Sequence, residues 1–407
     1  MPDARDVARA VEEAHRSHWA TVLAATVRLT RDLDLAEDCT QDAFVRALQT
    51  WATGIPDSTG GWLATVARRL ALDRMRHEAT LRRKLPLLAV EAAPRAGPDP
   101  RPGDPLRLVF TCCHPALGRD AQLALTLRLM CGLTTAEIAR VLLAKETAVA
   151  ARITRAKQKI AGAGVPFRLP SDDALPARLD TVLTVVHLAY TAGHSASGDR
   201  LVREDLTARA VGLARLLVAQ LPQEPEALGL LALLLFAEAR ARSRLDPGGN
   251  LVLLADQDRS RWDSSLVHEG LALATRALGA GDGRFTLQAA IAGLHMSSPA
   301  WEATDWPQVV RMYDALLLRW PSPVVALNRA AAASLVPGAD LEAVLRDLDA
   351  LEGEPTLAAY PYLPATRADV LSRLGRGTQA RQAYDDALAL TDSEAERRFL
   401  LSRRGGP

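Results

Sequence analysis

The chain has 407 residues, of which 48% are apolar and 24% charged, and its formal net charge is +1. This composition is ordinary for a globular protein and excludes an intrinsically disordered chain. At roughly 150 residues per domain, the length corresponds to two or three domains. Only 4% of the residues are aromatic, and abundant Ala and Leu favour helix over sheet. The longest apolar run, residues 227–237, is half of the roughly 20 residues that a membrane helix needs, and we expect an all-α cytoplasmic protein.

The near-zero net charge hides an asymmetry between two parts of the chain. Residues 1–165 contain 24 Lys and Arg against 18 Asp and Glu, whereas residues 166–407 contain 25 against 30. All four lysines lie in the first part. A basic part joined to an acidic part suggests that the first binds a polyanion and that the second has another role.

The first predicted elements are helical. Residues 5–29 and 34–51 place apolar side chains at helical spacing. A turn-rich loop over residues 53–61 follows, and a basic helix begins at Trp62 and continues to about residue 84. That helix carries seven Arg and Lys against two acidic residues. Arginines with an aromatic residue beside a flexible loop suit single-stranded or melted DNA, whose bases can stack and whose phosphates need neutralising.

A second, smaller helical module is predicted after a linker. Residues 85–105 contain six prolines and little periodicity, which is typical of a linker. In the following module, Thr134 and Glu137 have the spacing of a capping box. A turn and a basic helix from Thr147 to about residue 160 follow, and together these features predict a helix-turn-helix with four basic residues that can reach bases or phosphates in a major groove: Arg152, Arg155, Lys157 and Lys159. An amphipathic helix with a solvated basic face is the alternative.

The remaining residues, 171–407, read as successive helices. Two stretches that begin near residues 326 and 365 resemble each other at a spacing of 38–39 residues, which is typical of stacked tetratricopeptide-like hairpins. A plain helical bundle stays possible. The acidic residues around residues 256–269 are expected to form caps and internal ion pairs rather than a cation site. We expect Trp301 and Trp306 to pack in the core.

The four cysteines do not have the spacing of zinc knuckles. Cys112, Cys113 and His114 are adjacent in sequence, and neighbouring residues rarely satisfy one tetrahedral ion. We expect them to be structural, and we expect no cofactor and no metal. The chain also lacks a Gly-rich phosphate loop, GxSxG, HExxH and any recognisable nucleophile–base arrangement, so we expect no enzymatic activity.

Several segments resemble a known family. Residues 34–44, 62–69 and 73–76 resemble region 2 of extracytoplasmic-function (ECF) sigma factors, and residues 133–160 are similar to their region 4. Residues 110–115, 256–262 and 301–306, with the long helical tail, resemble the subgroup that has a tetratricopeptide-like C-terminal extension. The resemblance implies an all-α protein with a region 2 bundle (1–84), a flexible linker (85–105), a region 4 helix-turn-helix (106–165) and a helical regulatory extension (171–407).

The resemblance also implies partners and residue roles. The helix around residues 34–51 would bind core RNA polymerase, whose β′ clamp helices and β subunit are the expected contacts, through Asp38, Gln41, Asp42 and Phe44. The loop 53–61 would capture a flipped base of the −10 promoter element. The residues expected to hold the melted −10 strand are Trp62, Arg68, Arg69 and Arg76, and those expected at the −35 element are Thr147, Arg152, Arg155, Lys157 and Lys159. The linker would lie toward the RNA channel of the polymerase.

Two departures from the family pattern concern DNA contacts. Arg69 stands where the family usually has Asn, and residues 148–152 read Ala-Val-Ala-Ala-Arg where the family usually has Thr-Val-Lys-Ser-Arg. Since a good base contact contributes roughly 1–3 kcal/mol, these changes are large enough to alter promoter choice.

The function predicted from the sequence is therefore that of an alternative sigma factor. Its extension would control activity through intramolecular contact with the sigma domains. The alternative is a free-standing helix-turn-helix regulator with a helical sensor domain, which needs no polymerase and binds duplex DNA by itself.

Overall fold

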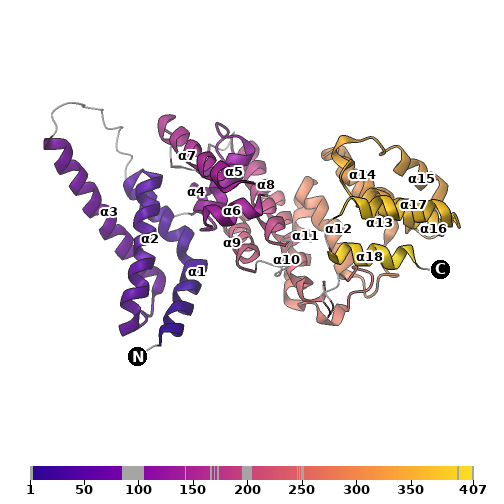
Figure 1. Cartoon of the computed structure of the whole chain (residues 1–407), viewed down its shortest axis with the longest axis horizontal. Coiled ribbons are helices and arrows are strands. Elements are labelled where there is room, and N and C mark those ends of the chain that lie inside the picture. The colour runs from indigo at the N-terminus through magenta and orange to yellow at the C-terminus, as the bar shows by residue number, and fades with distance from the viewer. Residues whose placement is uncertain are drawn as a thin grey trace. The chain divides into compact units, whose positions relative to one another are not determined.

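The computed structural model describes residues 3–84, 105–142, 144–165, 174–194, 204–244, 252–391 and 394–405, with the short pieces 167–168, 170–171, 246 and 248. All regular structure in these ranges is helical, which confirms the all-α class (Figure 1). None of the described helices is long and apolar enough to cross a membrane. The chain forms two compact units, residues 1–216 and 217–407. The predicted linker falls outside the described residues, except that its last residue begins a helix.

The N-terminal unit begins with a three-helix bundle. Its helices are α1 (Ala4–Thr30), α2 (Leu33–Thr50) and α3 (Thr59–Lys84), and each contacts the other two (Figure 1). The side chains of Asp3 and Asp32 accept backbone N–H bonds at the starts of α1 and α2. Arg31, between these two helices, has a φ of 55° and reverses the chain. Trp51, in the short 3₁₀ helix η1 (Trp51–Thr53), is fully buried beneath the start of α3.

Four shorter helices follow: α4 (Pro105–Cys112), α5 (Arg119–Leu129), α6 (Thr135–Val141) and α7 (Glu146–Gly162). α4 is almost entirely buried, and α7 packs on α5 and α6. Two further helices, α8 (Leu175–His194) and most of α9 (Glu204–Gln220), belong to this same unit. The Arg178 guanidinium of α8 donates to the carbonyl of Phe110 at 2.5 Å. The boundary between the compact units therefore lies inside α9, about 45 residues beyond the predicted start of the extension.

The C-terminal unit starts with α10 (Pro225–Ala239), α11 (Ser264–Ala280) and α12 (Arg284–Ser297), with the short helices η2 (Ala241–Ser243) and η3 (Arg259–Arg261) between the first two. α10 is the long apolar run of the sequence, and it is buried against both α11 and α12. Gly229 allows α10 to lie close to the backbone of α12, because a Cβ there would be 2.6 Å from the backbone nitrogen of Thr286. The Glu226 carboxylate accepts the N–H groups of Phe285 and Thr286 at 3.0 and 2.9 Å and so caps α12.

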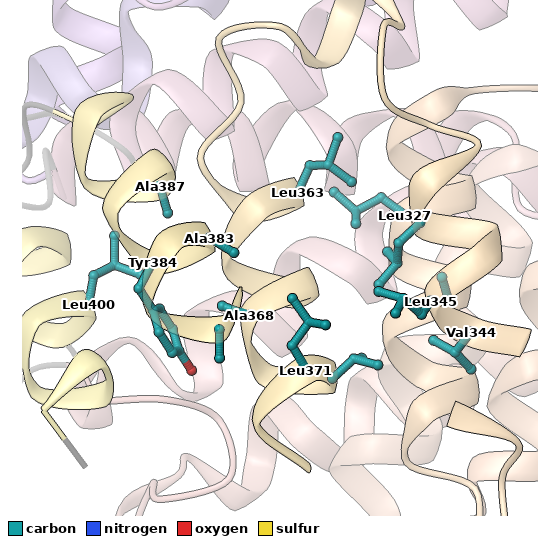
Figure 2. Packing of buried hydrophobic residues seen from close by; sticks show 14 of the residues in the cluster. Leu327, Val344, Leu345, Leu363, Ala368, Leu371, Ala383, Tyr384, Ala387 and Leu400 are labelled. Carbon is teal, nitrogen blue, oxygen red and sulfur yellow. The ribbon is translucent and has the colours of Figure 1, made fainter. Parts of the chain in front are cut away.

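The rest of this unit is a series of helices in which each contacts the next: α13 (Trp306–Arg319), α14 (Pro323–Ser334), α15 (Leu341–Asp349), α16 (Tyr362–Arg373), α17 (Gly377–Ala389) and α18 (Glu394–Arg404), with η4 (Pro355–Leu357) between α15 and α16. Helices α14–α18 share one apolar core, whereas α13 packs with α12 and one side of α14 in a second core. Figure 2 shows Leu327 and Leu345 near Leu363 and Leu371, and Tyr384 beside Leu400. Leu327, Leu348 and Leu371 are at most 1% exposed.

One ion pair recurs between successive hairpins. Arg329 of α14 contacts Asp314 of α13 at 2.7 Å. The same contact joins Arg367 of α16 to Asp349 at 2.8 Å, and Arg404 of α18 to Asp385 of α17 at 2.7 Å. The three arginines stand 38 and 37 residues apart. The two stretches that resemble each other in sequence lie on successive pairs of helices, α14 with α15 and α16 with α17.

The acidic and aromatic segments of this unit are structural, as the sequence predicts. Asp258 and Asp263 accept the first N–H groups of η3 and α11. Arg259 donates to two backbone carbonyls at the end of α12, at 2.6 and 2.8 Å. Trp301 and Trp306 pack edge to face at 4.6 Å and both contact the His295 ring. These side chains tie the α10–α12 region to the hairpins that follow.

Candidate nucleic-acid and polymerase interface

The helix-turn-helix is built from α6 and α7. Thr134 Oγ1 accepts the N–H of Glu137 at 3.2 Å, and the Glu137 carboxylate accepts the N–H of Thr134 at 2.8 Å, so the predicted capping box is present. The buried stripe of α7 consists of Val149, Ile153, Ala156 and Ile160. This stripe fixes α7 on the module and determines which of its polar side chains face outward.

The outward face of α7 carries most of the residues predicted at the −35 element. Thr147, Arg155 and Lys159 are exposed. Arg152 lies on the flank of this face, its side chain 29% exposed, and contacts Asp120 of α5 at 3.5 Å. Four predicted residues thus share a surface that can be presented to a DNA groove.

Lys157 does not share that surface. Its side chain is only 10% exposed, and its Nζ contacts Asp34 at 2.6 Å and Glu37 at 2.7 Å, both on α2 of the first bundle. Burial disfavours the ammonium, but the two carboxylates outweigh it and raise the pKa of Lys157. In this structure the predicted DNA contact of Lys157 is replaced by an intramolecular one, because residue 157 points to the side of α7 that faces α2.

The predicted −10 residues lie on α3. Trp62, Arg69 and Arg76 recur at seven-residue intervals, which places them on one helix face. Arg68 and Arg69 are exposed, and Arg76 contacts Asp73 at 3.3 Å with both side chains mostly exposed. Trp62 is half-buried and packs edge-on against Trp51, with ring centroids 5.6 Å apart. The opposite face of α3 is held in the bundle by Leu63, Ala67 and Ala71.

The loop before α3 is short and mostly exposed. It continues from η1 through Gly54 to Ser58, whose hydroxyl accepts the N–H of Gly61 at 3.3 Å. This loop and the Trp62 end of α3 are adjacent, so a base that leaves a duplex beside the loop can also reach the basic face of α3.

The predicted polymerase-binding residues of α2 do not all face outward. Asp38 and Gln41 are exposed, whereas Asp42 is half-buried and contacts Arg74 of α3 at 2.5 Å. Phe44 is 6% exposed and packs in the bundle core against His15 and Trp19. A buried ring cannot form a docking contact, so we remove Phe44 from the candidate surface.

Two exposed apolar residues extend the same face of α2. Val45 and Leu48 are 52% and 50% exposed. They follow Asp38 and Gln41 at helical spacing, so the outward stripe of α2 runs from acidic to apolar. Sequence reasoning overlooked both residues. They could have been found because they are apolar but lie outside the apolar face of this helix, to which the buried Ala47 belongs.

The cysteines lie in the protein core. Cys112 and Cys113 are at most 1% exposed, and Cys39 and Cys131 are also buried. Burial raises the pKa of Cys113 to about 12, so its thiol stays protonated. Burial and the nearby Arg178 lower the pKa of His114, whose Nδ1 accepts the N–H of Ala116 at 3.2 Å. The described residues contain no group of three or more His, Cys, Asp and Glu that could hold a metal ion.

Comparison with known families identifies three segments. Residues 15–80 match sigma-70 region 2 and residues 107–160 match sigma-70, region 4. Residues 178–278 match a family of unknown function, DUF6596. The first two matches coincide with the α1–α3 bundle and with the module that contains the helix-turn-helix.

Among individual proteins, one relative matches nearly the full chain and another matches only about a third of it. The uncharacterized protein R00370 of Rhizobium meliloti is 40% identical over 389 residues, which cover 93% of this chain and 91% of that protein. The two proteins therefore belong to one family. A probable ECF RNA polymerase sigma factor, SigI of Mycobacterium tuberculosis, is 29% identical over 161 residues, which cover 37% of this chain and 54% of SigI. No solved structure matches the chain.

Proposed function

We propose that this chain, which matches regions 2 and 4 of the sigma-70 type, is an alternative sigma factor of the ECF type. The observation that carries the proposal is that two sigma domains present two separate basic faces, one on α3 and one on α7, beside an exposed stripe on α2. A protein of this kind binds core RNA polymerase and promoter DNA. It directs the polymerase to promoters and catalyses no reaction itself.

On the DNA side, we assign the α3 face to the melted −10 strand. Trp62 offers a stacking surface, and Arg68, Arg69 and Arg76 offer positive charge to phosphates. We assign the α7 face, with Thr147, Arg152, Arg155 and Lys159, to the duplex −35 element. Arg69 and the alanines at residues 148, 150 and 151 differ from the usual family pattern. We therefore expect this protein to prefer promoter sequences that differ from those usual for the family.

On the protein side, we assign the outward stripe of α2 to core polymerase, with the β′ clamp helices as the expected partner. Asp38 and Gln41 would supply polar contacts, and Val45 and Leu48 would lose their exposed apolar surface on docking. Asp42 would act indirectly, because its ion pair with Arg74 holds α2 and α3 together.

We further propose that the helical extension controls the activity of the sigma domains in the cytoplasm. Two observations support a linked role. The similarity to R00370 continues through the extension, and α8 and most of α9 fold with the sigma domains. A truncation that tests this role should end at Gln220, so that α8 and α9 stay in place, and we expect it to change the amount of promoter-directed transcription.

The decisive experiment is binding of the full chain to core RNA polymerase. We expect Asp38→Ala/Val45→Ala to weaken binding at least about tenfold, because both side chains are exposed on the α2 stripe. A matched control is Glu12→Ala/Glu13→Ala, two exposed acidic residues on α1, which should leave binding unchanged. Absence of core binding, together with tight binding to duplex DNA by the chain alone, would establish the free-standing helix-turn-helix regulator instead.

A further inference from the structure

The C-terminal unit contains a cavity that lies outside the sigma domains. It has a volume of about 240 Å³ and lies where the segment between α15 and α16 meets α16 and α17. Typical small-molecule sites have volumes of roughly 300–1,000 Å³ and combine apolar walls with a few polar groups. The size of this cavity therefore suits a small organic molecule, and its walls determine which kind.

The inner part of the cavity is apolar. It is lined by Leu357, Leu363 and Ala383, which are at most 8% exposed, and Figure 2 shows the last two of them. Toward the mouth the apolar lining continues through Ala358 and Leu390, and Leu390 is 38% exposed. A ligand with an apolar body would therefore remove apolar surface of the protein from water, which favours binding.

The mouth of the cavity is acidic. Glu352, Glu354 and Asp386 contribute to its lining, and all three are exposed. Asp386 accepts a hydrogen bond from the Gln382 amide at 3.0 Å, but neither Asp386 nor Glu354 forms an ion pair with a residue that the structure describes. Two carboxylates without a cationic partner therefore border an apolar cavity.

The arginine that lines the cavity does not offset these two carboxylates. Arg367 Nε contacts Asp349 at 2.8 Å and Glu352 at 3.2 Å, so its charge is already compensated. An anionic ligand would be repelled by Glu354 and Asp386 and would find no unpaired cation among the described residues that line the cavity. The lining thus favours a positively charged ligand.

We propose that this cavity binds a small organic cation, namely a primary amine with an apolar body. The apolar body lies against the inner walls, and the ammonium donates hydrogen bonds to the carboxylates of Glu354 and Asp386 at the mouth. An ammonium has three donors, so it can satisfy both carboxylates and still bind water. The described residues of the lining include no aromatic ring, so the cavity does not suit a quaternary ammonium, which aromatic cages recognise.

A bound amine would link two successive hairpins. Glu354 belongs to the segment that follows α15, and Asp386 belongs to α17. A ligand held by both carboxylates binds only the folded unit, so the melting temperature of this unit should rise with the concentration of the amine. Neither polymerase nor DNA takes part in this binding, so the site does not depend on the proposed function, and a chain that fails to bind core polymerase can still bind the amine.

The experiment is isothermal titration calorimetry of the full chain with hexylamine, hexanol and hexanoate, which share an apolar body and differ in charge. We expect one molecule of hexylamine to bind per chain, at least about tenfold more tightly than hexanol, because only the ammonium forms charge-assisted hydrogen bonds with the carboxylates. Hexanoate should not bind. From propylamine to pentylamine the Kd should fall about fourfold for each added CH₂ group, as expected for the burial of methylene groups.

Two variants and one control locate the site. Glu354→Gln/Asp386→Asn removes both unpaired carboxylates at exposed positions and should raise the Kd for hexylamine at least about tenfold. Ala358→Leu places a larger apolar side chain at an exposed position of the lining and should weaken the binding of hexylamine by obstruction. Asp256→Asn removes an exposed carboxylate that does not line the cavity, and this variant should bind hexylamine like the unsubstituted chain.

Three results would overturn the amine site. Equal affinity for hexylamine and hexanol would contradict recognition of the charge. Unchanged affinity for hexylamine in a folded Glu354→Gln/Asp386→Asn chain would place the ligand elsewhere. Tighter binding of Nα-acetyl-lysine amide than of butylamine would show that the cavity takes a lysine side chain of a partner protein instead of a free amine. If Ala358→Leu does not fold, the carboxylate variant, whose two positions are exposed, decides alone.

Discussion

Arginines in the two units of this protein have different partners. On the sigma domains, Arg68, Arg69 and Arg155 are exposed and form no ion pair with any residue that the structure describes. In the C-terminal unit, six arginines each contact a carboxylate on a neighbouring helix or turn: Arg319, Arg329, Arg367, Arg376, Arg403 and Arg404. The same residue type is therefore exposed on the basic faces of one unit and joins hairpins in the other.

The difference explains why a net charge is a poor guide to function here. In the C-terminal unit, opposite charges lie within 4 Å of each other and largely cancel at a distance. On α3 and α7 the charges of Arg68, Arg69 and Arg155 remain available to a polyanion, whereas Arg74 and Lys157 are paired with carboxylates of α2. We expect substitutions in the C-terminal unit to change stability and substitutions on the two basic faces to change DNA binding.

The largest expected effect is on the shared core of the hairpins. Leu348 is fully buried in the apolar core that α14–α18 share. Leu348→Ala should lower the free energy of unfolding of the C-terminal unit by about 2–5 kcal/mol, because it leaves a cavity. Urea denaturation followed by circular dichroism measures this. Leu318→Ala, at a position 85% exposed, is the control, and an equal loss in both variants would mean that this core does not hold the unit together.

The second effect depends on pH and involves His295. Burial, with Arg240 and Arg259 nearby, lowers the pKa of His295 to about 4, whereas an unfolded histidine has a pKa of about 6.5. As the pH falls from about 6.5 to 4, the unfolded state takes up a proton that the folded state does not. The stability of this unit should therefore fall by up to about 3 kcal/mol.

The measurement for His295 is the urea midpoint at pH 7, 6 and 5, followed by tryptophan fluorescence, because Trp301 and Trp306 contact this ring. His295→Gln should flatten the pH dependence relative to the unsubstituted chain, since the buried amide does not titrate. Parallel curves for the two proteins would show that His295 does not cause the acid sensitivity.

The third prediction concerns the recognition helix. Arg155→Gln removes one exposed charge from α7, so the slope of log Kd against log salt for duplex DNA, in the presence of core polymerase, should decrease by about 0.9. Affinity at low salt should fall about tenfold, with an unchanged melting temperature. Arg16→Gln, an exposed position on α1, should change neither slope nor affinity. Equal effects of the two variants would indicate diffuse attraction instead of a basic face.

The smallest effect should come from one of the recurring ion pairs. Arg367 contacts Asp349 at 2.8 Å and Glu352 at 3.2 Å, at partly exposed positions. Arg367→Gln should cost about 0.5–1 kcal/mol, less at high salt, and should leave DNA binding unchanged. Arg381→Gln, an exposed arginine on α17 without an ion pair to a described residue, is the control. A change in DNA binding by Arg367→Gln would contradict the expectation that arginines of the C-terminal unit affect stability alone.

Local patterns made much of this structure predictable from the sequence. The Thr134–Glu137 box, the basic face of α3 and the hairpin spacing depend on residues close together in the chain, and all three are present. The packing of Trp301 and Trp306 followed from their place beside Pro299 and Pro307, at a predicted hairpin corner. Such features need no knowledge of which distant helices meet.

Contacts between distant segments were not predictable in this way. Lys157 has the same spacing pattern as its basic neighbours, yet it pairs with Asp34 and Glu37 of α2, which lie 123 and 120 residues earlier. Phe44 fits the family's docking helix but fills the bundle core, and α8 joins the sigma domains although the prolines and glycines before it suggested a domain boundary. A helical pattern indicates which faces are buried, but it does not identify the partner that buries them.

The ion pair that recurs between hairpins affects how the C-terminal unit can change in evolution. Arg329, Arg367 and Arg404 each contact an aspartate in the preceding hairpin, so a similar arginine–aspartate joint connects successive hairpins. Duplication or deletion of one segment of 37–38 residues would leave every joint complete. We therefore expect the number of hairpins to be easier to change than the size of the sigma domains, whose described residues contain no such repeated joint.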